Sequence, residues 1–168
     1  MYALKPISLD AVPSALARAE RYRFLNEPEQ AESICEDVLE VDPSNHEAHI
    51  TLILALTEQF AHHEPSLVAR AQEQVARLES EYERAYYSGI VAERRTRAFL
   101  KRGGPGASLP AADWLHAAMQ AFERADELRP AGNDDARLRW NACARMAARH
   151  PHLLAGDEEE RGQPLMLE

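Results

Sequence analysis

The amino-acid sequence predicts an all-α protein built from antiparallel helix hairpins. Leu, Ala, Glu and Arg are the commonest residues and β-branched residues are few, a composition that favours helices over strands. A set of four residues also recurs with the same gaps of four, three and five positions. In each set a small residue lets a neighbouring helix approach, a larger residue one turn later shares its face, and a proline ends the helix. The two sets are Ala31, Cys35, Val38, Pro43 and Ala118, Phe122, Ala125, Pro130.

The first two predicted helices form a hairpin. Residues 1–9 are interpreted as an N-terminal arm, and Asp10 can cap a helix that runs to Leu25. Pro28 opens the second helix, because a proline in the first turn lacks only an N–H that would have no partner there. This helix ends at Val41, just before an Asp-Pro pair.

The third helix begins at a capping box made by Ser44 and Glu47, whose side chains each bond a backbone N–H at the helix start. It runs to Phe60. Residues 62–66 then interrupt the helical pattern and separate this helix from the fourth.

The boundary between the fourth and fifth helices depends on one signal, because no Gly or Pro forces a turn there. A second capping box, Ser80 with Glu83, divides the stretch into a helix over 66–78 and another over 81–101. A single continuous helix over 66–101 is the alternative.

A Gly/Pro-rich loop separates the fifth helix from a sixth over 111–128. Asn133-Asp134 can cap the last helix, which ends at Arg149 before a proline. Residues 151–168 are interpreted as an acidic, flexible tail. The helical domain is thus expected to span residues 10–150.

The chain carries a net charge of −9, which disfavours polyanions as general partners, so nucleic acid is not expected. Six basic residues nevertheless lie between Arg84 and Arg102, against the single acid Glu93. No apolar run approaches the ~18 residues of a membrane span and no targeting segment is visible, so we expect a cytoplasmic protein without membrane contact. Cys35 and Cys143 are too few for a disulfide framework and are interpreted as reduced core residues.

The residue pattern resembles the tetratricopeptide repeat (TPR) family, whose unit is a helix-turn-helix of about 34 residues. Residues 12–45 are the best full copy, with Cys35 in the place of the usual aromatic residue, and the last helix resembles the capping helix of such proteins. Arg18, where an apolar residue is expected, and an insertion over 62–65 depart from the pattern. The matching positions are Ala19, Tyr22, Ala31, Val38 and Pro43 in the first copy, Leu52 and Leu56 in the second, and Gly89, Ala118, Phe122, Ala125 and Pro130 in the third.

This resemblance implies a right-handed superhelical solenoid of about three repeats and a C-terminal capping helix. It also implies a concave groove, lined by the first helix of each hairpin, that binds an extended peptide or a partner helix. The apolar and aromatic residues of this lining suit an apolar ligand. The cationic residues with which cochaperones of the family hold a C-terminal carboxylate are missing, so binding of chaperone tails is not predicted. The residues expected to line the groove are Leu16, Glu20, Arg23, Ile50, Leu54, Glu58, Tyr86, Tyr87, Ile90, Arg94, Leu138, Asn141 and Arg145.

Residues of catalytic or metal-binding type do not form a recognisable motif. Four histidines, at positions 46, 49, 62 and 63, lie near three glutamates, but no HExxH pattern or pair of cysteine ligands accompanies them. The Gly/Pro-rich loop lacks the GK[ST] ending of a phosphate-binding loop. Cys143 has Trp140 and Met146 around it and is interpreted as a core residue. We therefore expect no enzyme activity, no catalytic or metal site and no cofactor.

The expected function is a non-enzymatic protein-protein interaction module, an adaptor, scaffold or dedicated chaperone of bacterial type. One alternative is a regulatory module that contacts an enzyme or a nucleic-acid partner through the basic helix 84–102. Another is a homodimer that associates through the groove. The acidic run 157–160 complements the basic helix, so we also hypothesise that the tail, residues 153–168, docks back onto the helical domain, with the groove as one site.

Overall fold

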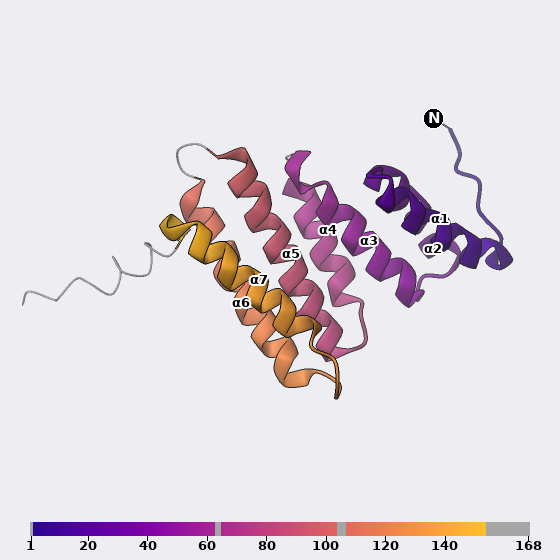
Figure 1. Cartoon of the computed structure of the whole chain (residues 1–168). Helices are drawn as coiled ribbons and strands as arrows, with labels where there is room; N and C mark the ends of the chain where they lie inside the picture. Colours follow the sequence, from indigo (N-terminus) through magenta and orange to yellow (C-terminus); the bar gives the residue numbers. More distant parts are fainter. Residues whose placement is uncertain (1, 63–64, 104–106, 154–168) are drawn as a thin grey trace, which may run out of the picture.

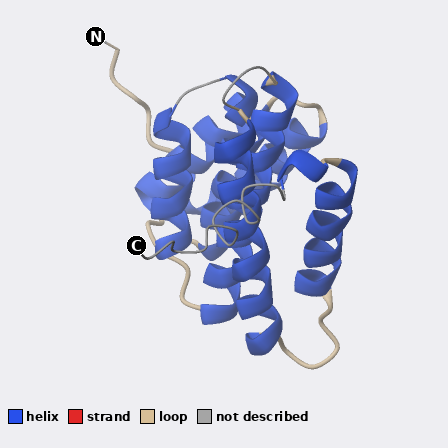
Figure 2. Cartoon of the chain, turned by 90° about the vertical axis from the view of Figure 1, so that its left-hand side faces the viewer, coloured by secondary structure: helices blue, strands red, loops and turns tan. Residues whose placement is uncertain are grey.

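The structure, a computed structural model, describes residues 2–62, 65–103 and 107–153. These residues form α-helices and short 3₁₀ helices and contain no strand, which confirms the all-α prediction (Figure 2). None of the described helices is long and apolar enough to cross a membrane. The α-helices are α1 (Val12–Phe24), α2 (Pro28–Val41), α3 (His46–Glu58), α4 (Pro65–Ala76), α5 (Glu81–Arg102), α6 (Ser108–Leu128) and α7 (Asp135–Arg149), and the 3₁₀ helices are η1 (Leu9–Ala11), η2 (Phe60–His62) and η3 (Pro151–Leu153).

Each helix packs against the helix that follows it in the chain, from α1 with α2 through to α6 with α7. The odd-numbered helices also make contacts of their own, α1 with α3 and α3 with α5. Figure 1 shows the result: the helices cross the molecule in chain order, with α1 and α2 on one side and α6 and α7 on the other. The two longest helices, α5 and α6, pack most extensively.

The start of α5 is the predicted one. The Ser80 hydroxyl oxygen accepts a hydrogen bond from the backbone N–H of Glu83 at 3.3 Å, which satisfies one of the unpaired donors in the first turn. Because α4 ends at Ala76 and α5 begins at Glu81, residues 66–101 form two helices, and the alternative of one continuous helix is wrong.

Two other predicted caps are wrong. Asp10 lies in η1, and α1 begins at Val12 without a side-chain cap. At the start of α3 the cap is Asn45, one residue after the predicted Ser44: the Asn45 Oδ1 accepts from the N–H of Ala48 at 2.9 Å. The Asn45 amide also donates to Asp42 at 2.9 Å, and this second bond holds it in the capping position.

The C-terminal boundaries also differ from prediction. Helix α6 begins at Ser108, three residues earlier than expected, because Pro110 falls in the first turn, where its missing N–H costs nothing. Residues 151–153 form η3, and Leu153 is only 5% exposed, so the packed structure extends beyond the predicted limit at residue 150. Residues 154–168, including the rest of the predicted tail, lie outside the described residues.

The two recurring residue sets mark the centre of the core. Their prolines follow the ends of α2 and α6 by two residues, as expected of residues that cannot continue a helix. Cys35 and Cys143 are buried and form no disulfide, which agrees with their interpretation as core residues. The six other members of the sets, all 0% exposed, are Ala31, Cys35, Val38, Ala118, Phe122 and Ala125.

Gly89 on α5 faces the ring of Phe122 on α6 with no space between them. A Cβ atom at residue 89 would lie 2.5 Å from the ring Cε1 and 2.6 Å from Cδ1, well inside van der Waals contact. The ring cannot move aside easily, since it is fully buried and the Tyr86 ring lies against it with centroids 5.9 Å apart. Glycine at this position therefore sets how closely α5 and α6 approach.

A double-mutant cycle tests this contact. Phe122→Ala is expected to lower the free energy of unfolding by ~3–5 kcal/mol, as for a large core truncation. Gly89→Ala should lower the free energy of unfolding by up to ~2 kcal/mol, because overpacking costs ~1–3 kcal/mol and alanine gains only ~1 kcal/mol over glycine in a helix. In the Phe122→Ala background Gly89→Ala should instead raise the free energy of unfolding, since the ring is gone and only the helix-propensity gain remains.

Urea unfolding followed by circular dichroism gives all four free energies. If Gly89→Ala stabilises the protein that retains Phe122, the close approach of α5 and α6 is not as described.

Candidate partner-binding surface

Ion pairs cross the face formed by α1, α3 and α5. Arg23, at the end of α1, donates two hydrogen bonds to the Glu58 carboxylate at the end of α3, from Nη2 to Oε1 at 2.7 Å and from Nε to Oε2 at 3.2 Å. The two side chains are 17% and 21% exposed, so most of the pair is shielded from water. Arg94 of α5 approaches the same carboxylate, with Nη1 3.9 Å from Oε1. Glu58 therefore links three helices.

A second group of ion pairs links α5 to α7. Glu93 is 1% exposed, and its carboxylate accepts hydrogen bonds from Arg97, at 2.7 Å from Nη2, and from Arg139 of α7, at 3.4 Å from Nη1. Burial acts to lower the pKa of Arg139, but a hydrogen bond with Tyr86 and the charge of Glu93 outweigh burial and raise it. The guanidinium of Arg139 thus bridges the charged and the aromatic residues of α5.

Arg94 lies between these two groups. Burial is the main cause of its lowered pKa, and the positive charges of Arg139 and Arg23 act in the same direction. The carboxylates of Glu58 and Glu93 oppose them. Within the described part of the chain, the Arg94 side chain forms no hydrogen bond. We call the five residues Arg23, Glu58, Glu93, Arg94 and Arg139 the odd-helix face, because they come from α1, α3, α5 and α7.

Two of the predicted groove residues lie in the core instead. Leu16 is 3% exposed and belongs to a cluster with Val38 and Ala48, and Ile90 is 1% exposed in a cluster with Phe122. The prediction that Leu16 and Ile90 line a groove is wrong, because α1 and α5 each pack against more than one neighbour and bury a wider stripe than a helix covered on one side.

The other predicted groove residues expose less apolar surface than expected. Ile50 and Leu54 of α3 are half-buried and pack against the core, as do Tyr86 and Tyr87, whose rings meet edge to face at 5.2 Å. Burial raises the pKa of Tyr87 to about 12. Arg23, Glu58 and Arg94 form the ion pairs described above, and the exposed members are Glu20, Leu138, Asn141 and Arg145.

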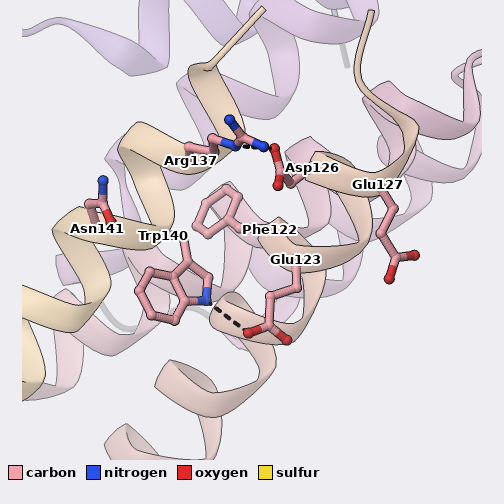
Figure 3. A pocket seen from close by; sticks show the side chains of 7 residues that line it. All are labelled: Phe122, Glu123, Asp126, Glu127, Arg137, Trp140 and Asn141. Carbon is pink, nitrogen blue, oxygen red and sulfur yellow. Dashed lines mark hydrogen bonds and ion pairs between the residues drawn. The ribbon is translucent and has the colours of Figure 1, made fainter.

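A pocket of about 440 Å³ opens between α6 and α7 (Figure 3). Phe122 and Trp140 form its apolar part, and the Trp140 Nε1 donates to Glu123 at 3.1 Å. The Arg137 Nε donates to Asp126 at 2.8 Å. Asn141, predicted to line the groove, lines this pocket instead. The other lining residue is Glu127, which pairs with Arg124 at 3.0 Å.

The predicted basic face of α5 divides into parts with different roles. Arg84 donates to the backbone carbonyls of Leu78 and Glu79, at 2.6 and 2.8 Å, and so joins the start of α5 to the segment before it. Arg97 is held by Glu93. Arg94 belongs to the odd-helix face, whereas Arg95 and Arg102 lie against the ring of Phe99, near the C-terminal end of the helix.

Two of the histidines considered for metal binding, His46 and His49, are engaged in structural contacts. His49 Nδ1 lies 2.8 Å from Gln74 Oε1, and its Nε2 lies 3.1 Å from the carbonyl oxygen of Pro43. His46 bonds Glu83 at 2.8 Å. Among the described residues no group of three or more His, Cys, Asp or Glu side chains is placed to hold a metal ion. His63 and Glu64 lie outside the described residues.

Arg139 and Glu93 are not among the groove residues predicted from the sequence, although both belong to the odd-helix face. The i, i+4 spacing of Glu93 and Arg97 is a usable signal for an ion pair on one helix. Arg139 lies 46 positions from Glu93 in the chain, so no local pattern connects them.

Comparisons of the chain with protein-family models, with curated proteins and with solved structures gave no match. The resemblance to tetratricopeptide repeats therefore stays a prediction from the residue pattern.

The link between Arg23, Glu58 and Arg94 is expected to contribute to stability. Glu58→Gln should lower the free energy of unfolding by ~1–3 kcal/mol, since it weakens hydrogen bonds to a charged group that is mostly shielded from water. The control is Arg124→Gln, which removes an ion pair whose side chains are 55% and 67% exposed. Its expected effect is within ~0.5 kcal/mol. Urea unfolding measures both, and equal losses would show that Glu58 is no more important than a surface carboxylate.

The thiols are expected to be unreactive in the folded protein. Burial raises the pKa of Cys35 and of Cys143 from 9 to about 12, and only the thiolate is nucleophilic, so labelling by an aromatic disulfide at pH 8 should be on the order of a thousandfold slower than in urea. A raised pKa stabilises the fold fully below pH 9, and this contribution is lost as pH rises from 9 to 12.

Urea unfolding at pH 8, 10 and 11 checks the pH dependence. The loss of stability between pH 8 and 11 should be smaller in the Cys35→Ala/Cys143→Ala variant than in the wild type. An equal loss in both proteins would show that other groups cause the pH dependence.

Proposed function

We propose that the protein is a non-enzymatic interaction module of the tetratricopeptide type, in which the odd-helix face binds a peptide or partner helix that carries carboxylates. Packing in chain order, with added contacts from α1 to α3 and from α3 to α5, supports a solenoid of helix hairpins. The buried alanines on α2 and α6 are the small residues at which such hairpins pack.

The incomplete pairing of the Arg94 guanidinium is the observation that best supports the proposal. It is a half-buried cation whose nearest carboxylate oxygen is 3.9 Å away, beyond hydrogen-bond distance. Removing a cation from water without full pairing is costly, and burial does lower its pKa. A carboxylate from a partner would complete its hydrogen bonds in the bidentate geometry that arginine favours. The odd-helix face also has three arginines against two glutamates, which leaves it positive in an acidic protein.

This proposal changes the ligand expected from sequence. An apolar peptide would find few fully exposed apolar side chains on the odd helices, because Ile50 and Leu54 are half-buried and Leu16 lies in the core. Leu138, which is 63% exposed, is an apolar side chain that such a ligand could cover. The ligand class is therefore an acidic segment with an apolar residue near its carboxylates.

Selection from a random peptide library displayed on phage tests the proposal. Selected peptides should be rich in Asp and Glu, and Arg94→Gln should weaken their binding at least tenfold, because losing one partner of a shielded charge pair costs ~2–5 kcal/mol. Arg124→Gln, on the exposed side of α6, serves as the control and should bind normally. Circular dichroism confirms that both variants fold.

Peptides without carboxylates, or equal binding to the Arg94→Gln variant, would contradict the proposed site. A labelled single-stranded oligonucleotide tests the nucleic-acid alternative. Tight binding that falls steeply with salt, with log K decreasing linearly in log salt, would favour that alternative.

A further inference from the structure

A basic patch at the C-terminal end of α5 is separate from the odd-helix face. The guanidinium carbons of Arg95 and Arg102 each lie 4.7 Å from the centroid of the Phe99 ring. The three residues lie at positions i−4, i and i+3 of one helix, so they share one stripe. Lys101, beside them in the chain, is exposed. We call Arg95, Phe99, Lys101 and Arg102 the Phe99 patch.

The charges of the Phe99 patch have no balancing carboxylate within the described part of the chain: none of its three cations has an ion pair there. Burial lowers the pKa of Arg95, and the positive charge of Arg102 lowers it further. Two like charges held on one ring repel each other, and a run of carboxylates would relieve that repulsion. The charge of the Phe99 patch is thus complementary to that of an acidic segment.

The chain itself brings an acidic segment to this end of the molecule. Leu153 is 5% exposed in the cluster against which Phe99 and Leu100 also pack. It follows α7, whose end lies at the same end of the molecule as the start of α6 (Figure 1). The four consecutive acids 157–160 begin four residues after Leu153. An extended chain covers about 3.3–3.6 Å per residue, so the first of these acids can lie up to ~14 Å from Leu153 and the last up to ~25 Å.

We infer that the acidic run Asp157–Glu160 of this same chain docks on the Phe99 patch and shields it from other anionic partners. Charge complementarity and the short connection argue for this occupant over a separate protein, because a segment tethered by a few residues has an effective concentration in the millimolar range. The odd-helix face remains free in this arrangement. The inference does not depend on the proposed function.

A cycle of full-length variants tests the inference with a labelled ten-residue polyglutamate peptide as probe. The neutral-tail variant, Asp157→Asn with Glu158→Gln, Glu159→Gln and Glu160→Gln, should bind the probe at least tenfold more tightly than the wild type. Adding Arg95→Gln and Arg102→Gln should remove that gain. The matched control adds Arg18→Gln and Arg21→Gln, two exposed arginines on α1, and should retain it.

Side-chain NMR gives an independent readout in the same proteins. Neutralising the tail should shift the Nε–Hε signals of Arg95 and Arg102 and leave those of Arg18 and Arg21 unchanged. The inference is overturned if the Phe99 patch signals do not move, or if the neutral-tail variant binds polyglutamate no better. It is also overturned if the shifts scale with protein concentration, since the tail would then dock on a second copy.

Discussion

The contact between Gly89 and the Phe122 ring is the constraint on which the second half of the structure depends. Because no side chain separates them, α5 and α6 pack closely along their length and fix the ring beneath Tyr86. Tyr86 in turn acts on Arg139 of α7, whose pKa it raises. A guanidinium of the odd-helix face is therefore linked, through the rings of Phe122 and Tyr86, to a missing Cβ atom on α5.

The charged residues of the odd-helix face connect helices that are not joined directly in the chain. Glu58 and Glu93 are the centres of these links, and each receives two arginines. Shielded ion pairs are weak evidence for stability alone, since desolvation offsets much of their attraction. Under the proposed function this fixed geometry would act as preorganisation, because arginines already held in place would lose little side-chain freedom on binding a partner's carboxylate.

Local pattern in the sequence predicted the helices and much of the core, and failed where distant segments meet. The Ser80 cap and the buried members of the two recurring sets depend on neighbours within one or two turns, so spacing reveals them. The cap at Asn45 was missed because adjacent Ser and Asn are both good caps, and its bond to Asp42 decides between them. Burial of Leu16 and the link from Arg139 to Glu93 depend on which helices pack together.

The order of helix packing has a consequence for how the protein folds. Each α-helix contacts its immediate successor, so the chain can form most of its structure without closing long loops, a topology associated with rapid folding. Stability should also vary along the molecule, because the hairpin of α1 and α2 lies at one end of the row of helices and packs against α3, whereas α5 contacts α3, α4 and α6. Local unfolding is expected to begin at the hairpin of α1 and α2, while α5, which carries Arg94, and the helices around it stay folded.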